Sequence, residues 1–296
     1  MESVQESVLG LAGDGAPMIA RQQRLAQPML GGAMRLEDDA YLGAYATGIT
    51  GAAGIRGRFN LGGITLLAGA SYAEDHGGRA ALDDAVTLAA AIRYVLPGDS
   101  RLRLYTEAGG WSASASRLAL SRTYVNGAGT ATGVGTPEAD LSYIYFRAGL
   151  VLRMPHRGEL VVAGEIGRSS LDVDAYVEPL SNANPFEAHV AARSERSAMY
   201  RARLQYSIEI LPAFDVTAYG AAVWAHPDDA SLVSATIPGI GRIVARGGNS
   251  AWAEFGARLG YRIAPRVTFD AFIDADTGED GVGDGFHVGL GIRLRL

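Results

Sequence analysis

The chain has 296 residues, of which 48% are hydrophobic and 20% are charged, with a net charge of −6 and no cysteine. The lack of cysteine excludes disulfides and thiolate metal sites, and the negative charge argues against nucleic acid as a partner. No run of 18 apolar residues occurs, so the sequence predicts no transmembrane helix. The N-terminus also lacks the basic and apolar pattern of a signal peptide.

Residues 1–35 predict two short helices. Ser3 and Glu6 have the spacing of a capping box, which opens a helix. Pro17 suits the first position of a second helix, and Pro28 ends it. We therefore expect a helical segment to precede the rest of the chain.

The second predicted helix is polar for its length. Between residues 17 and 27 it carries Arg21, Arg24 and three glutamines among few large apolar side chains. Such a segment suits a polar channel and is poorly suited to lipid.

From residue 40 onward, apolar and polar residues alternate in run after run, which predicts β-strands with one apolar face. Most runs have 11 or more residues, enough for a tilted strand to cross the apolar band of an outer membrane, about 25 Å tall. We expect twelve strands, an even number, as in bacterial single-chain barrels: 40–50, 52–61, 63–74, 84–96, 101–117, 139–154, 158–177, 194–211, 213–226, 249–263, 266–276 and 285–296.

The two faces of these strands differ in kind. In the run 266–276, for example, Phe269 and Ile273 lie opposite Asp270 and Asp274. The second face of several strands carries charges of both signs, which a dry core accepts only if each charge is compensated. A water-filled lumen accepts them readily, so the pattern predicts an antiparallel transmembrane β-barrel, not a sandwich.

Connections between the predicted strands alternate between short and long. Short ones, rich in turn-forming residues, fall at 60–63, 97–100, 155–158, 211–213 and 264–265. Long ones fall near 75–83, 118–138, 178–193, 227–248 and 277–284. Outer-membrane barrels have short periplasmic turns and long extracellular loops. We therefore expect a periplasmic C-terminus and extracellular long loops.

The last eleven residues alternate to the end of the chain. A soluble chain rarely ends on such a strand, because termini tend to fray. A barrel needs such a strand in order to close. The apolar positions of this strand are Phe286, Val288, Leu290, Ile292, Leu294 and Leu296.

This arrangement resembles the translocator domain of autotransporters (type V secretion), in which a helical segment precedes a twelve-stranded outer-membrane barrel. Three stretches carry the resemblance: Asn184–Val190, Trp252–Arg262 followed by Ala264-Pro265, and Phe286–Leu296. The resemblance implies that residues 1–35 are a linker and pore plug and that residues 36–296 form the barrel. It further implies that the barrel exports an upstream passenger to the cell surface.

Site residues follow from the same resemblance. Arg21 and Arg24 would lie in the pore on the helix, and the six apolar positions of the last strand would form a C-terminal signal for assembly. The lumen would be lined by Arg56, Arg58, Arg93, Arg103, Glu107, Arg147, Glu165, Arg201, Arg203, Glu209, Glu254, Arg258 and Asp270.

The chain departs from the family pattern at two points. The final residue is Leu296, where the family usually has an aromatic residue. Some members cut themselves at an asparagine pair in the pore helix, but residues 1–59 contain no asparagine. That cleavage chemistry therefore has no nucleophile here.

Other chemical motifs are weak. Gly98-Asp99-Ser100 is similar to a lipase serine block, but it links two strands and is expected to be a turn. The carboxylates of 274–280 and Asp284 lack the order of a calcium-binding loop, so a solvated surface loop is expected. His189, His226 and His287 have no set spacing that predicts a metal site. We expect no enzyme activity, no metal and no cofactor.

The predicted location is the outer membrane, and the predicted partners are lipid and lipopolysaccharide, the barrel-assembly machinery and the N-terminal passenger, with no nucleic acid. Two alternatives share the barrel: a stand-alone porin-like channel, and an adhesin that binds through loops 118–138 and 227–248. An outer-membrane hydrolase is a third, but the sequence shows no serine and histidine placed together on the outer wall.

Overall fold

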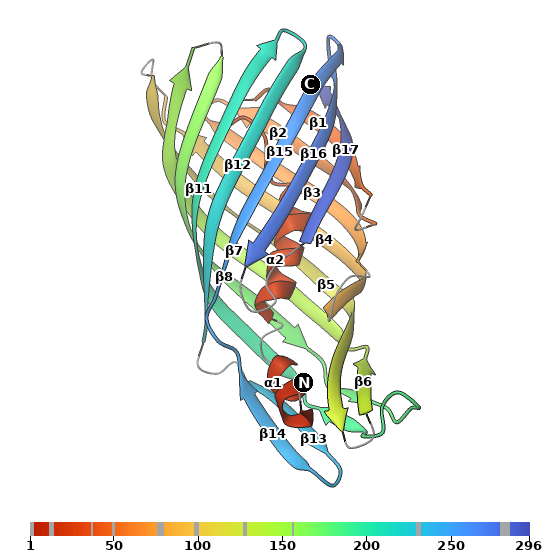
Figure 1. Ribbon diagram of the computed structural model, residues 1–296. Coiled ribbons are helices and arrows are strands. Elements are labelled where there is room, and N and C mark those ends of the chain that lie inside the picture. The colour runs from red at the N-terminus through yellow and green to blue at the C-terminus, as the bar shows by residue number, and fades with distance from the viewer. Residues whose placement is uncertain are drawn as a thin grey trace.

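The computed structural model describes residues 3–11, 15–36, 38–48, 51–75, 80–97, 101–126, 129–155, 157–228, 232–278 and 285–296. The predicted turn at 98–100 and the loop residues 279–284 lie outside these ranges. Within them the chain forms two helices followed by β-strands (Figure 1). No helix in these ranges has the length and apolar character needed to cross a membrane.

The first helix, α1 (Val4–Leu11), begins at the predicted capping box. The Ser3 amide donates to the Glu6 carboxylate at 2.6 Å, and the Glu6 amide donates to Ser3 Oγ at 3.2 Å. The hydrogen bond from the Ser3 amide is the main reason that the pKa of the Glu6 carboxyl group is lowered. The two reciprocal bonds satisfy amide groups that a helix start otherwise leaves without partners.

The second helix, α2 (Gly15–Ala26), begins two residues before Pro17. After it the chain forms a compact turn, in which the Gly32 amide donates to the Gln27 carbonyl at 2.8 Å. Gly31 lies in this turn at φ 71°, a conformation that glycine adopts readily and other residues rarely do. We call residues 27–40 the connecting segment; it links α2 to the first strand.

Twelve strands of the described chain form a closed antiparallel barrel, as the sequence predicts. Each strand pairs with its neighbours, β4 with β5 included, and β1 closes the ring by pairing with β17, Tyr41 opposite Arg295. The strands are β1 (Tyr41–Thr47), β2 (Ala53–Leu61), β3 (Ile64–Asp75), β4 (Ala80–Val95), β5 (Leu102–Asn126), β7 (Glu138–Met154), β8 (Gly158–Val173), β11 (Arg193–Leu211), β12 (Phe214–Pro227), β15 (Ser250–Ala264), β16 (Val267–Gly278) and β17 (Gly285–Arg295).

Three of the predicted long loops contain further strands instead of irregular chain. Strand β5 continues far past the predicted end at residue 117 and pairs with β6 (Gly129–Gly135). A second, four-stranded sheet runs in the order β14-β13-β10-β9. Its strands are β9 (Tyr176–Glu178), β10 (Ala188–Val190), β13 (Leu232–Ile237) and β14 (Gly241–Arg246).

These additional strands, together with the end of β5 from Leu118 onward, form what we call the cap. It lies at the end of the barrel opposite the C-terminus, and α1 lies against it (Figure 1). Leu11 of α1 is fully buried with Leu118, Val233 and Ile237 of the cap. Apolar burial therefore holds the first helix outside the barrel mouth.

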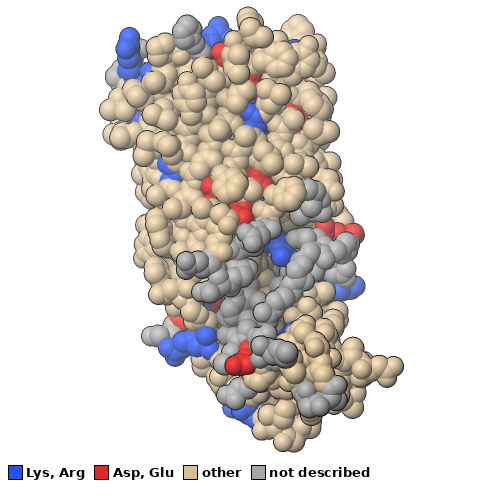
Figure 2. Space-filling view, in the orientation of Figure 1, with Lys and Arg blue, Asp and Glu red and all other residues tan. Residues whose placement is uncertain are grey.

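The outer wall of the barrel is apolar. Ile55, Ile144 and Leu290 are 65%, 66% and 55% exposed there, and Figure 2 shows a face on which charged residues are sparse. Large apolar patches of this kind mark contact with a membrane or a partner. A closed barrel also satisfies every backbone group within the wall, which is a requirement inside a lipid bilayer.

Candidate functional site: the helix-filled pore

The helix α2 lies inside the barrel (Figure 1). It contacts β3, β4, β7, β8 and β16, which stand on different sides of the wall. Most of its residues are buried, including the polar Gln22, Gln23 and Arg24. Arg21 is half-buried on the same helix. The pore is therefore filled by a helix whose buried residues are both polar and apolar.

Polar side chains at the C-terminal end of α2 make specific contacts with the wall. Arg24 Nη2 lies 2.9 Å from Asp276 Oδ2. The indole of Trp111 donates to Gln23 Oε1 at 2.6 Å. A third contact follows the helix end, where Gln27 Nε2 donates to Glu254 Oε2 at 3.0 Å. The Tyr219 hydroxyl donates to Gln27 Oε1 at 2.6 Å.

The partner of Arg24 corrects an expectation from the sequence. Asp274 and Asp276 were expected in a solvated surface loop, but each is only 4% exposed and faces the pore. The signal was present in the alternation, since both share parity with Asp270 on β16. The predicted strand 266–276 already includes both residues, so its alternation indicated the lumen face, and the observed strand runs two residues further, to Gly278.

A row of alternating charges on the inner wall takes one residue from each of six strands, skipping β12 between β11 and β15, and we call it the charge belt. Each member forms an ion pair with the next at 2.5 to 2.9 Å. Five of the six members are buried, and the remaining arginine is half-buried. Because the signs alternate, each buried charge is compensated by its neighbours. The members are Arg93, Glu107, Arg147, Glu165, Arg201 and Glu254.

Tyrosine hydroxyl groups complete the acceptor capacity of the belt. Tyr145 donates to Glu107 at 2.7 Å, and Tyr143 donates to Glu165 at 2.6 Å. The last carboxylate of the belt, that of Glu254, also accepts the hydrogen bond from Gln27 Nε2. The belt therefore extends from the wall to the chain that fills the pore.

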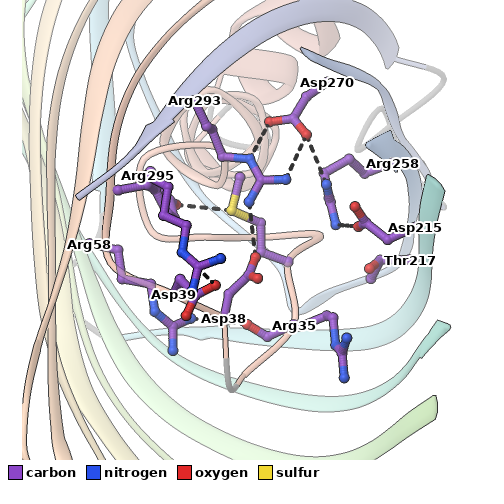
Figure 3. Close-up of polar contacts among 12 residues, drawn as sticks. Arg35, Asp38, Asp39, Arg58, Asp215, Thr217, Arg258, Asp270, Arg293 and Arg295 are labelled. Atoms are coloured by element: carbon purple, nitrogen blue, oxygen red, sulfur yellow. Dashed lines mark hydrogen bonds and ion pairs between the residues drawn. The ribbon is translucent and has the colours of Figure 1, made fainter. Parts of the chain in front are cut away.

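A second charge cluster centres on the fully buried Asp270 (Figure 3). Its carboxylate accepts from Arg56 at 2.9 Å, from Arg258 at 2.8 Å and from Arg293 at 2.7 Å. Arg258 also pairs with Asp215. Three strands besides β16 thus share one carboxylate. It joins β2, β15 and β17 near the pairing of β1 with β17, which closes the barrel and which we call the seam.

The last strand is also joined to the connecting segment. Arg293 Nη1 lies 3.0 Å from Asp38 Oδ2, and Arg295 Nε lies 3.1 Å from Asp39 Oδ2. Burial alone would raise the pKa of Asp38, but the positive charge of Arg293, with smaller contributions from Arg258 and Arg58, holds the pKa below its ordinary value. The segment that leads to the pore helix is therefore anchored at the C-terminal end of the barrel.

The remaining predicted lumen residues differ in depth. Arg58 and Arg203 are buried and donate to the connecting segment, whereas Arg103 is half-buried. Glu209 lies at the rim and pairs at 2.9 Å with Arg157, which is 73% exposed. This contact raises the pKa of Arg157.

Two further buried polar residues were not among the residues predicted to line the lumen. In the cap, the fully buried Arg122 donates to Glu178 at 2.6 Å and to Ser7 Oγ of α1 at 3.1 Å. His287, also fully buried, lies 3.4 Å from Asp274. In the described part of the chain no group of three or more acidic, histidine or cysteine side chains is placed to hold a metal ion.

The predicted assembly positions of the last strand all lie on the outer wall. Their exposed fractions range from 39% to 58%, and they are Phe286, Val288, Leu290, Ile292, Leu294 and Leu296. Their recognition by an assembly machinery stays a prediction.

Fold and site together define a transmembrane β-barrel whose pore is filled by an N-terminal helix. No protein-family model and no curated protein matches the chain. Among solved structures, it is similar to the translocator domain of the autotransporter NalP from Neisseria meningitidis, with a TM-score of 0.63 and 14% identity over 96% of this chain and 99% of that chain.

Two other solved barrels are less similar. The beta domain of the Bordetella autotransporter BrkA has a TM-score of 0.48 and 13% identity over 87% of this chain and 99% of that chain. The NanC porin has a TM-score of 0.43 and 10% identity over 87% of this chain and 100% of that chain. At these identities the likeness concerns the fold alone, a barrel similar to that of the NalP translocator domain.

Proposed function

We propose that the chain is the translocator domain of an autotransporter, which sits in the outer membrane and exports an upstream passenger to the cell surface. The observation that carries this proposal is the path of the N-terminal chain. It is anchored beside the C-terminus through Asp38 and Arg293, passes through the pore as α2 and reaches the cap as α1. A chain that crosses the whole barrel is what export through the pore requires.

The same path supports an orientation. The end with the C-terminus has the short connections, and the end with the cap has the long ones (Figure 1). In outer-membrane barrels the short turns face the periplasm. The cap and α1 then lie outside the cell, and anything joined ahead of α1 begins there.

The contacts of α2 suit a plug that is seated and yet removable. They combine polar contacts at Gln23, Arg24 and, just past the helix end, Gln27 with the burial of Ile19 and Leu25 in an apolar cluster shared with the wall. The polar contacts can be exchanged for contacts with water when the helix leaves the pore, because a hydrogen bond to water largely replaces one within the protein. The apolar outer wall would contact lipid and lipopolysaccharide, and the last strand would meet the barrel-assembly machinery.

A reporter fusion tests the export role. An export signal and a passenger that carries an antibody tag are fused ahead of residue 1, and the fusion protein is expressed in a Gram-negative host. We expect an antibody to label the tag on intact cells. A tag that stays periplasmic beside a folded, membrane-inserted barrel would contradict a translocator function.

Single-channel conductance separates the porin alternative. The full-length chain is expected to be nearly closed in a planar bilayer, because α2 fills the pore. A variant without residues 1–35 is expected to open, with its folding checked by heat-dependent migration on gels. Equal, large conductance of both proteins would favour a stand-alone channel.

A further inference from the structure

The connecting segment is held by its main chain. From Gly32 to Leu36, five consecutive carbonyl oxygens each accept a hydrogen bond from a side chain of the barrel wall. Arg258 Nε donates to the Ala33 carbonyl at 2.8 Å, and Gln205 Nε2 donates to the Met34 carbonyl at 2.8 Å. We call the four donors the carbonyl clamp: Arg58, Arg203, Gln205 and Arg258.

The clamp surrounds the segment from several strands. Arg58 lies on β2 and reaches two carbonyls, Nη1 lying 3.0 Å from that of Arg35 and Nη2 bonding that of Leu36. The other donors lie on β11 and β15. On β8, Glu159 accepts from the Leu36 amide at 2.7 Å. Side chains from four strands thus converge on one stretch of backbone.

Two of the clamp arginines depend on these carbonyls. Arg58 and Arg203 are 3% and 7% exposed. In the described part of the chain, their hydrogen bonds go to neutral oxygens, namely the segment carbonyls and the side-chain oxygens of Asn60 and Gln205. The guanidinium group of Arg203 also lies over the Tyr219 ring, 4.1 Å from its centroid. A buried cation without an acceptor is strongly unfavourable, so the segment backbone completes this part of the wall.

Two side chains of the segment also contact the barrel: Leu36 packs in a buried apolar cluster with Val151 and Val161, and Met34 Sδ accepts from the Tyr41 hydroxyl at 2.9 Å. Ala33 and Arg35 are half-buried, while Met34 and Leu36 are buried apolar residues. Every residue of a polypeptide carries the same carbonyl acceptor. The four clamp donors, which bond five carbonyls, therefore recognise backbone whatever its sequence, and only the contacts of Met34 and Leu36 depend on the side chains that the segment carries.

We infer that the carbonyl clamp is a binding site for polypeptide main chain, held by the connecting segment in the resting barrel and open to other stretches of chain that pass through the pore. This rests on the proposed export function, in which such stretches are the passenger. Arginine suits this role because its five donors serve several acceptors at once and its charge does not titrate.

Cysteine labelling of the purified full-length barrel tests the clamp without any passenger. The chain has no cysteine of its own, and Leu30 is 7% exposed, so Leu30→Cys reports release of the segment. A wall variant, Arg58→Met with Arg203→Met, removes three of the five carbonyl contacts. We expect its labelling by a water-soluble thiol reagent to be at least about tenfold faster, a change equivalent to about 1.4 kcal/mol.

The matched variant changes the side chains of the segment and leaves its backbone: Ala33→Ser, Met34→Leu, Arg35→Gln and Leu36→Met. We expect its labelling rate to stay close to that of the reporter alone. Gln205→Leu, which removes one carbonyl contact, supplies a milder wall variant if the double variant does not fold, and should also speed labelling. Faster labelling in the side-chain variant than in the wall variants, or no change in the wall variants, would overturn the inference. No passenger is present in this labelling experiment. If the clamp variants behave as expected but the reporter fusion is not exported, only the proposed function is contradicted.

Discussion

Arg24 of the pore helix and Asp276 of β16 form an ion pair at 2.9 Å, although 252 residues separate them in the chain. Their side chains are 10% and 3% exposed, so water screens the pair little. This ion pair joins α2 to the wall at β16, where Asp276 lies opposite Glu254, the last member of the charge belt.

Removing Arg24 should loosen the plug. Arg24→Ala leaves the buried Asp276 carboxylate without its cation, a change that typically costs about 3 kcal/mol or more. We expect openings of the full-length barrel in a planar bilayer to become more frequent by about a hundredfold, since 1.4 kcal/mol is a factor of ten. Arg157→Ala, at an exposed rim pair, is the control and should leave the frequency unchanged. Equal behaviour of both variants would show that the Arg24 pair does not seat the helix.

Gly69 on β3 should be intolerant of a side chain because the connecting segment packs against it. A Cβ at this position would lie 2.7 Å from the Met29 Cβ and 2.8 Å from the Ile55 carbonyl oxygen. We expect Gly69→Val to destabilise the barrel by about 1–3 kcal/mol through overpacking, measured as a shift in the urea midpoint of folded barrel on gels. Gly164→Val on β8 is the matched control, since nothing lies within 4 Å of its Cβ. If the two valines behave alike, close packing at Gly69 is not limiting.

Asp270 should be the least replaceable carboxylate of the pore wall. Asp270→Asn removes the negative charge that Arg56, Arg258 and Arg293 share as their acceptor. Loss of one partner of a buried pair costs about 3–5 kcal/mol, so the urea midpoint should fall strongly. For Glu209→Gln, whose partner is exposed, we expect a change within about 1 kcal/mol. A small effect at Asp270 would mean that water, not this carboxylate, satisfies the three arginines.

Asp38 should make closure of the pore sensitive to acid. Its folded pKa is lowered, so its stabilising contribution is fully present above the ordinary aspartate pKa of about 3.9. The contribution is lost as the pH falls through the lower, folded pKa. We expect Asp38→Asn to open more often than the parent at pH 7, and the difference to shrink below about pH 4. Other carboxylates titrate in both proteins, so the comparison isolates Asp38. A difference that does not change with pH would contradict an ionised Asp38 at the seam.

Much of the barrel follows from local pattern alone. Side chains alternate across a strand, so runs such as 267–278 and 285–295 reveal both the strand and its two faces. For the same reason the burial of Arg56, Glu107 and Glu165 was predictable from parity with their neighbours. The pattern also extended where we expected loops: Leu118, Leu120, Arg122 and Tyr124 alternate as buried residues along β5. In that stretch the glycine-rich composition suggested a loop, although the alternation correctly indicated a strand.

What each inward side chain meets depends on the closed barrel. Alternation places Asp276 on the inward face of the predicted strand, but it says nothing of Arg24 as its partner. Likewise, Arg58, Arg203 and Arg258 look alike in sequence, but two of them bond mainly carbonyls of the connecting segment while the third also shares Asp270. Strand register and closure bring together residues from opposite ends of the chain, and these are long-range contacts that no local pattern records. The sequence by itself thus determined the strands and their inward faces, and the tertiary structure decided which chain fills the pore and which groups hold it.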